Sequence, residues 1–379
     1  MLSLRRSSLF IGACTALLLT YAWTHLYLFG PSLEEGVWEH VHGVTRFIIP
    51  DTLLYLLISQ VDTFGAVIQA SGVKNSVGPS LVWWILDHSW RAVSVFNAAC
   101  FMLMLVYVRR LILHLDPDQR GTFNRIALVL LFVAAYYSVG SLKEIPTLLG
   151  FTAFVHHFIA RQRLKAMLWF LFLTLFRFQF AYLIVPAYAL SKLRANPLRL
   201  TLMSLLVIGM LFPLVSILEV FTPAAVQSHR SGADLVPDSL GSKVEMARGR
   251  IAGVSFVAIL VRIAQTVFEP LIQLVGRRTF FEAGSLSVYL LHSTVVLLLM
   301  LPSWYTLFVK RLWEVRQSDP KSAQFGTLYA FVAISIFAYG GTGIVSHRFL
   351  VPAYALLLVA ARVDPVAAHE PALAPGATG

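Results

Sequence analysis

Long apolar runs constrain this chain more than any other feature of its sequence. Each approaches or reaches about 20 residues, the length at which an α-helix crosses the hydrocarbon core of a bilayer. Only helices and closed barrels satisfy their own backbone hydrogen bonds in lipid, and continuous runs exclude the alternating pattern of barrel strands. The expected fold class is therefore all-α. The runs are Leu9 to Phe29, Val93 to Leu113, Ile126 to Val139, Leu200 to Val220, Ile251 to Val275, Leu286 to Leu301 and Phe325 to Val345.

The balance of apolar and charged residues supports a membrane location. Only 13% of the residues are charged and 58% are apolar, whereas a soluble protein carries roughly a quarter of its residues as charged ones. We expect one polytopic transmembrane helical bundle over residues 1–363, with about eight to ten spans. The tail over 364–379 is rich in Ala and Pro, and we expect it to be disordered.

The formal charge of +11 does not indicate a nucleic-acid partner, because the basic residues lie in short clusters at helix ends. The positive-inside rule places such clusters on the cytoplasmic side. Arg5 and Arg6 precede an apolar stretch longer than the core of a cleaved signal peptide. We therefore expect a retained first helix with its N-terminus in the cytoplasm.

Two segments have the composition of external loops. Acidic residues outnumber basic ones over residues 30–91, and Trp83, Trp84 and Trp90 are typical of the headgroup layer. Phe47 to Ala70 is apolar with helical spacing, so the first loop should carry helices that lie on the membrane surface. A second, more polar external loop is expected over residues 221–250.

The run from Met167 to Leu190 allows two topologies. A single span would place the basic cluster that follows it outside, against the positive-inside rule. Two shorter helices folded back near Arg177 would return that cluster to the cytoplasm and would explain a charge in the middle of the segment. We favour the folded-back pair.

Charges near or within spans are costly and therefore mark candidate sites. Asp51 follows Pro50 and has Tyr55 one turn later on the same side of a helix. It fits a charge at a helix N-terminus or, alternatively, a carboxylate that takes a proton from a hydroxyl.

Lys143 and Glu144 fall at a tight turn before a return helix, where they are either solvated or able to meet a phosphate and a hydroxyl. Arg177 lies among phenylalanines, too deep to reach the surface by snorkelling alone. With Gln179 and Tyr182 nearby, it is a candidate for phosphate binding or an ion pair.

Two further polar pairs have simpler interpretations. His347 and Arg348 form a short polar junction that fits a cytoplasmic anchor as well as a site. His156 and His157 are adjacent, so their rings should point to different faces of a helix, and a metal site there is not favoured.

Short motifs follow one another along the chain in a definite order. They are Pro50-Asp51-Thr52 with Tyr55, Gly78-Pro79 followed by Phe96-Asn97, Ser141-Leu142-Lys143-Glu144, and Arg348-Phe349-Leu350-Val351-Pro352. Together they resemble bacterial membrane glycosyltransferases of the GT-C type and the related O-antigen and exopolysaccharide polymerases. Many of those proteins carry a second acidic residue in the first motif, where this chain has Asp51 alone.

The resemblance implies transfer of a sugar from a polyprenyl phosphate or diphosphate, in which cations stabilise the phosphate and a carboxylate accepts the proton of the acceptor hydroxyl. It implies a phosphate-binding role for Arg177, Lys143 and Arg348, a catalytic role for Asp51 and Glu144, and substrate binding for Tyr55, Gln179 and Tyr182.

The resemblance also implies partners and a location. The lipid carries the sugar, so no nucleotide cofactor is expected, and no metal ligands are assigned, although metal dependence stays open. The partners are a lipid-linked sugar donor, a glycan acceptor, the bilayer and, as candidates, other polysaccharide-export proteins. The implied location is the bacterial inner membrane.

Two other classes of function fit sparse charges in a membrane. A transporter or flippase of a lipid-linked substrate would need them too, although the chain lacks the repeated halves common in transporters. A non-catalytic or acyltransferase-like envelope subunit is the third class, and for an acyltransferase His292 would be the histidine of interest.

Overall fold

The computed structural model describes most of the chain, and the regular structure in the described part is entirely helical. The all-α prediction is therefore confirmed for these residues. The predicted loop over 221–250, apart from Phe221, and the predicted tail over 364–379 lie outside them. The described residues are 2–34, 55–56, 58–71, 77–116, 121–139, 143–177, 179–193, 196–221, 255–276, 285–313, 320–342 and 347–363.

The helices follow the apolar runs of the sequence. In chain order they are α1 (Leu2–Glu34), α4 (Phe64–Ser71), α5 (Val77–Ile85), α6 (Trp90–Leu115), α7 (Thr122–Tyr137), α8 (Glu144–Ile159), α9 (Arg163–Phe176), α10 (Gln179–Lys192), α11 (Pro197–Phe221), α14 (Ser255–Gly276), α15 (Ser285–Tyr305), the π-helix η1 (Thr306–Lys310), the 3₁₀ turns η2 (Arg311–Trp313) and η3 (His347–Ala353), α16 (Pro320–Thr342) and α17 (Tyr354–Arg362).

Three stretches in the described part are long and apolar enough to cross a membrane. They are Ser7–Tyr27 within α1, Trp90–Leu115, which is α6, and Leu290–Trp313 from α15 through η2. Shorter apolar helices accompany them, among them Thr122–Tyr137 and Ala323–Ala338. Length and composition therefore support a membrane protein.

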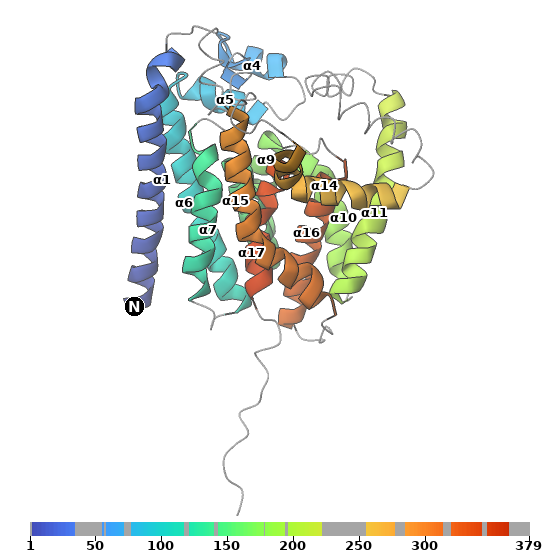
Figure 1. Cartoon of the computed structure of the whole chain (residues 1–379). Coiled ribbons are helices and arrows are strands. Elements are labelled where there is room, and N and C mark those ends of the chain that lie inside the picture. The colour runs from blue at the N-terminus through green and yellow to red at the C-terminus, as the bar shows by residue number, and fades with distance from the viewer. Residues whose placement is uncertain are drawn as a thin grey trace, which may run out of the picture.

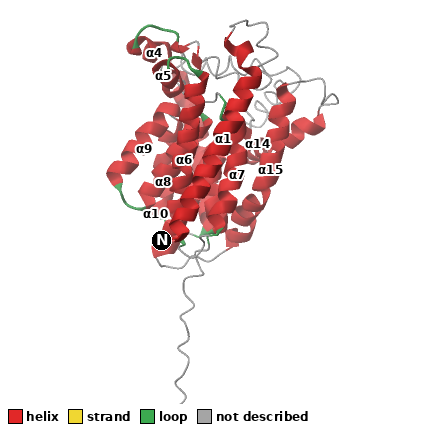
Figure 2. Cartoon of the chain, turned by 90° about the vertical axis from the view of Figure 1, so that its left-hand side faces the viewer, coloured by secondary structure: helices red, strands yellow, loops and turns green. Residues whose placement is uncertain are grey.

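The long helices form a bundle whose two ends differ (Figure 1). The N-terminus of α1 lies at one end, which we call the lower end. The short helices α4 and α5 lie at the other, the upper end, and Figure 2 shows them above α9 from a second direction. The expectation of short helices between the first two long ones is confirmed for α4 and α5.

The centre of the bundle is made by helices that are buried on nearly every side. All of α8 except Phe158 is buried, and α17 is buried from Tyr354 to Ala361. A helix that is apolar all round needs protein or lipid on every side. Here α6, α9 and η3 surround α8, so the start of α8 reaches the interior of the bundle at its upper end.

A glycine lets α8 and α9 approach closely. A Cβ atom on Gly150 would lie 3.1 Å from Cδ1 of Phe172 and 3.4 Å from Cα of Leu173. Such distances are tight for a real Cβ atom, so the missing side chain permits the contact. The two helices pack over much of their length, which brings the end of α9 beside the start of α8.

The fold-back predicted near Arg177 is confirmed. Helix α9 ends at Phe176, Arg177 is extended (φ −150°, ψ 87°), and α10 begins at Gln179. Arg177 lies beside Glu144 at the start of α8. Tyr188 near the end of α10 packs on Phe158 near the end of α8, with ring centroids 5.6 Å apart. Helix α10 therefore runs back along the direction from which α9 came.

Helix α14 differs from the spanning helix expected over Ile251 to Val275. Figure 1 shows it crossing the bundle at a steep angle to α15 and α16, on which it packs. Its polar Thr266 and Glu269 are buried, whereas Phe268 and Ile272 are exposed. Such a one-sided helix is typical of the interface layer rather than of a span.

The apolar stretch from Phe47 to Ala70, which has helical spacing, does not form one continuous helix within the described residues. Residues 61–63 form a bend, and α4 begins at Phe64. The hydroxyl oxygen of Thr63 accepts a hydrogen bond of 3.2 Å from the backbone N–H of Ala66. A threonine in this position caps a helix start, so it ends the preceding segment and starts α4.

A buried arginine ties two helix ends together at the lower end. Nη1 of Arg311 donates to the carbonyl oxygen of Ala360 at 2.9 Å and also to that of Val363. Both carbonyls lie at the C-terminus of α17, where a cation is favoured by the helix dipole. The guanidinium also lies 5.3 Å from the ring centroid of Phe325 in α16.

We predict that Arg311→Met lowers the free energy of unfolding by about 2 kcal/mol, because the buried carbonyls of α17 lose a charged donor. Thermal denaturation in detergent measures the change as a lower melting temperature. Lys310→Met, which removes the neighbouring exposed cation, is the matched control and should leave the melting temperature unchanged. Equal shifts in the two variants would contradict the role given to Arg311.

Candidate functional site

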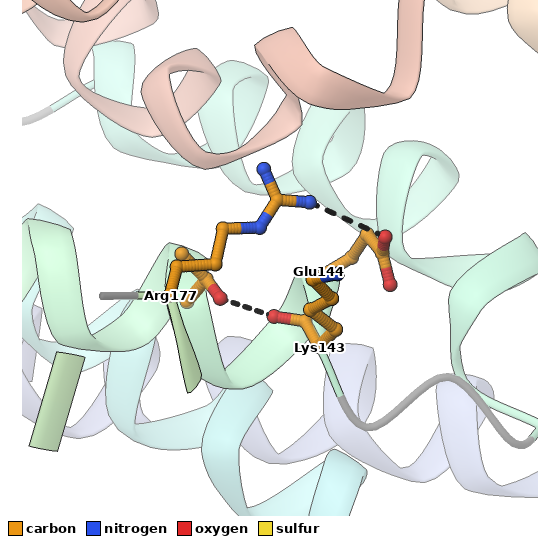
Figure 3. Close-up of polar contacts among 4 residues, drawn as sticks. Lys143, Glu144 and Arg177 are labelled. Carbon is orange, nitrogen blue, oxygen red and sulfur yellow. Dashed lines mark hydrogen bonds and ion pairs between the residues drawn. The ribbon is translucent and has the colours of Figure 1, made fainter. Parts of the chain in front are cut away.

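A buried ion pair joins α8 to the end of α9 at the upper end of the bundle (Figure 3). Nη2 of Arg177 lies 3.4 Å from Oε1 of Glu144, and the side chains are only 1% and 2% exposed. This distance is long for a hydrogen bond, so the attraction of opposite charges is the larger part of the contact. Taking either charge out of water alone would cost on the order of several kcal/mol.

The local structure explains why the carboxylate lies there. Glu144 is in the first turn of α8, where the helix dipole favours a negative charge. Thr147 donates its hydroxyl to the carbonyl oxygen of Lys143, which also accepts the backbone N–H of Thr147. These bonds hold the turn at the start of α8, and a dashed line in Figure 3 marks the hydroxyl bond to Lys143.

Lys143 brings a second cation to the same place. Its side chain is 9% exposed, and its Nζ lies 5.9 Å from the ring centroid of Tyr55. An ammonium group over an aromatic ring is attracted by the negative face of the ring. Tyr55 itself is buried with Trp83 and Val93, so the segment before α4 is packed against the start of α8.

Helix α5 lies directly on the end of α9. A Cβ atom on Gly78 would lie 2.7 Å from the carbonyl oxygen of Leu175 and 3.1 Å from Cγ of Phe176. No real Cβ atom approaches a backbone oxygen so closely, so only glycine permits this contact. Helix α5 therefore covers the chain immediately before Arg177.

Arg348 and Tyr136 extend the site toward α7. Arg348 lies in η3, which packs on α8. Tyr136 lies close to the end of α7, which also contacts α8. Nδ2 of Asn97 in α6 donates to the carbonyl oxygen of Ser138 at 3.1 Å and so fixes the end of α7. The site therefore draws on α7, α8, η3 and the break between α9 and α10.

The structure brings together most of the residues singled out in the sequence. Arg177 pairs with Glu144, and the adjacent Lys143 lies over the ring of Tyr55. Arg348 lies in η3, which packs on α8. Asp51 lies outside the described residues. Gln179 and Tyr182 lie in the first turn of α10, directly after the break, and their side chains are outside the described part.

Sequence reasoning missed Tyr136 and Thr147. Two features of the sequence could have pointed to them. Thr147 lies one helical turn after Lys143, and Tyr136 lies near the end of the apolar run that precedes Lys143 and Glu144. The expectation that the rings of His156 and His157 point to different faces was wrong: the rings lie 5.0 Å apart and both contact Tyr107. Side-chain rotation and a shared neighbour bring the rings together, at the other end of α8 from the ion pair.

The chemistry of the group is limited to charge and hydrogen bonding. A guanidinium and an ammonium at a buried helix end bind phosphate oxygens. The carboxylate neutralises the guanidinium and, once an anion competes for that cation, is available to accept a proton. In the described part of the chain, no three His, Cys, Asp or Glu side chains come together as metal ligands would.

We predict opposite effects for two glycine substitutions in the short helices. Alanine is favoured over glycine inside a helix by about 1 kcal/mol, so Gly65→Ala in α4, where a Cβ atom meets nothing within 4 Å, should keep or raise the melting temperature. Gly78→Ala should lower it, because the new methyl group pushes α5 off the end of α9. Shifts of the same sign in thermal denaturation would contradict this packing.

Comparison with known proteins leaves the site to be interpreted on its own geometry. No protein-family model, no curated protein and no solved structure matches the chain.

Proposed function

We propose that this chain is a membrane glycosyltransferase or polysaccharide polymerase that uses a polyprenyl phosphate- or diphosphate-linked sugar in the synthesis of a cell-envelope glycan. The observation that carries the proposal is the buried pair of Arg177 and Glu144, with Lys143 beside it, at one end of an apolar helical bundle. Such a group is costly to bury and needs a reason.

The charges match the needs of a lipid-linked donor. When the sugar leaves, negative charge develops on the phosphate, and preorganised cations stabilise it best in a site without water. Arg177 offers two parallel donors, and Lys143 adds a compact charge. In the absence of substrate, Glu144 compensates Arg177, so the site holds its cation ready without leaving it buried alone.

Donor binding gives Glu144 a second role. A phosphate that takes over Arg177 weakens the hold of the guanidinium on the carboxylate. Glu144 then accepts the proton of the acceptor hydroxyl, alone or with Asp51. The bond from the anomeric carbon to the phosphate oxygen breaks, the bond to the acceptor oxygen forms, and the electron pair stays on the lipid phosphate.

The proposed setting is a polytopic bundle in the bacterial inner membrane with the N-terminus in the cytoplasm. The lower end would then face the cytoplasm. Its exposed cations, such as Arg161, Arg163 and Lys165, agree with the positive-inside rule. The site at the upper end would face the outer leaflet, and α4, α5 and α14 would lie near that surface.

The test is sugar transfer by purified protein in liposomes supplied with a panel of polyprenyl-linked sugars. Arg177→Ala and Glu144→Gln should each lower the rate by about a hundredfold or more, since each removes a charge that acts in the transition state. Arg177→Lys keeps the charge but loses the planar fork, and should fall between Arg177→Ala and the wild type.

Arg199→Ala, which removes an exposed arginine at the start of α11, is the matched control and should transfer at the wild-type rate. Folding of every variant is checked by its melting temperature and elution volume. Wild-type transfer that survives in Arg177→Ala would overturn the assigned site. Absence of transfer by the wild type across the whole panel would overturn the proposed function.

A further inference from the structure

A histidine stacks on the tyrosine at the edge of the site. His292 lies in α15, near the start of the apolar stretch Leu290–Trp313. Its ring is 5.1 Å from that of Tyr136, centroid to centroid, at an interplanar angle of 25°. Histidines in apolar spans are uncommon and mark functional positions, yet the ion pair and the lysine of the site do not use this one.

The ring of His292 is fixed in place by α7. Its Nε2–H donates to the carbonyl oxygen of Phe132 at 3.1 Å, and a carbonyl can only accept, so Nε2 carries the proton. The ring also stacks on Phe132 at 5.3 Å with an interplanar angle of 15°. The ring of Tyr137 meets the ring of His292 edge-on, with the two centroids 5.8 Å apart and an interplanar angle of 84°. The imidazole ring of His292 is thus held flat against one face of the Tyr136 ring.

Tyr136 is placed to meet a substrate. It is partly buried, and it lies at the end of α7, a helix that contacts α8. A tyrosine hydroxyl donates one hydrogen bond, and phosphate oxygens accept several. Stacked aromatic rings have a preferred geometry. The stacked ring of His292 therefore restricts the orientation of the Tyr136 ring and, with it, the direction of this hydroxyl.

We propose that Tyr136 supplies a further substrate-binding hydroxyl, donated to a phosphate oxygen of the lipid-linked donor, and that His292 is the positioning residue for it. The inference rests on the proposed function, because it takes the donor from it. Under this inference, α7 and α15 join the elements that recognise the phosphate. It also gives a role to His292, which the pair of Arg177 and Glu144 does not use.

The first experiment measures binding of undecaprenyl phosphate to the purified protein in detergent micelles. Tyr136→Phe keeps the stacked ring and removes the hydroxyl, so it should weaken binding about tenfold or more, the effect of one hydrogen bond to a charged group. Tyr305→Phe removes an exposed hydroxyl from the far end of α15 and should bind as the wild type does. The melting temperature should be unchanged in both variants.

The second experiment separates positioning from a general structural role. His292→Ala should weaken binding, and His292→Phe, which keeps a flat ring against Tyr136, should restore most of it. In the Tyr136→Phe background, His292→Ala should cause no further loss, because a residue that acts through the hydroxyl has nothing left to act on. A purely structural histidine would give additive losses together with a lower melting temperature.

The outcomes distinguish this inference from the function on which it rests. Wild-type protein that binds the lipid phosphate and transfers sugar, with Tyr136→Phe equal to Tyr305→Phe in both assays, would overturn the inference alone. Additive losses in the double variant would overturn the role of His292. Wild-type protein that neither binds undecaprenyl phosphate nor transfers sugar would overturn the proposed function and the inference together.

Discussion

The ion pair between Arg177 and Glu144 is the contact on which the upper end of the molecule depends. A guanidinium and a carboxylate that are both almost fully buried are stable only when each compensates the charge of the other and further hydrogen bonds satisfy their remaining polar atoms. This requirement fixes the register of α8 against α9, and it explains why α9 stops where it does. Arg177 follows the end of α9 in an extended conformation, and there its side chain lies beside Glu144.

The close contacts around the pair follow from this requirement. Gly150 lets α8 and α9 approach along their length, and Gly78 lets α5 settle on the last turn of α9. Both glycines lie where a methyl group would hold two backbones apart. Backbone therefore packs closely on backbone at the last turn of α9, directly before Arg177.

Much of this arrangement could be predicted from the sequence, for physical reasons that apply to each part. The apolar runs predict the long helices because lipid allows little else, and the charge at Arg177 predicts the break because a guanidinium in mid-span needs a partner. The crossing of α14 could not be predicted from hydropathy. Its exposed apolar residues offset its buried Glu269, so the mean hydropathy of the segment equals that of a membrane span. The bend before α4 depends on a single helix cap, Thr63, and the helical spacing of the apolar residues continues across it.

The candidate site was only partly visible in the sequence. Lys143, Glu144 and Arg177 stand out because charges are rare in such a chain, but nothing in their spacing says that two of them are paired. Tyr136 and His292 are far apart in the sequence, and only the packing of α15 on α7 brings them together. Aromatic residues are frequent throughout this chain, so a functional tyrosine has no distinguishing pattern until its neighbours are known.

The most direct test of the central claim is a structure of the protein in lipid nanodiscs with undecaprenyl phosphate bound, determined by electron cryomicroscopy. We expect density for the phosphate at the upper end, within hydrogen-bonding distance of the guanidinium of Arg177 and close to Lys143. We also expect the carboxylate of Glu144 to turn toward the space for the acceptor. Phosphate density at the exposed cations of the lower end, with Arg177 and Glu144 still paired, would contradict it.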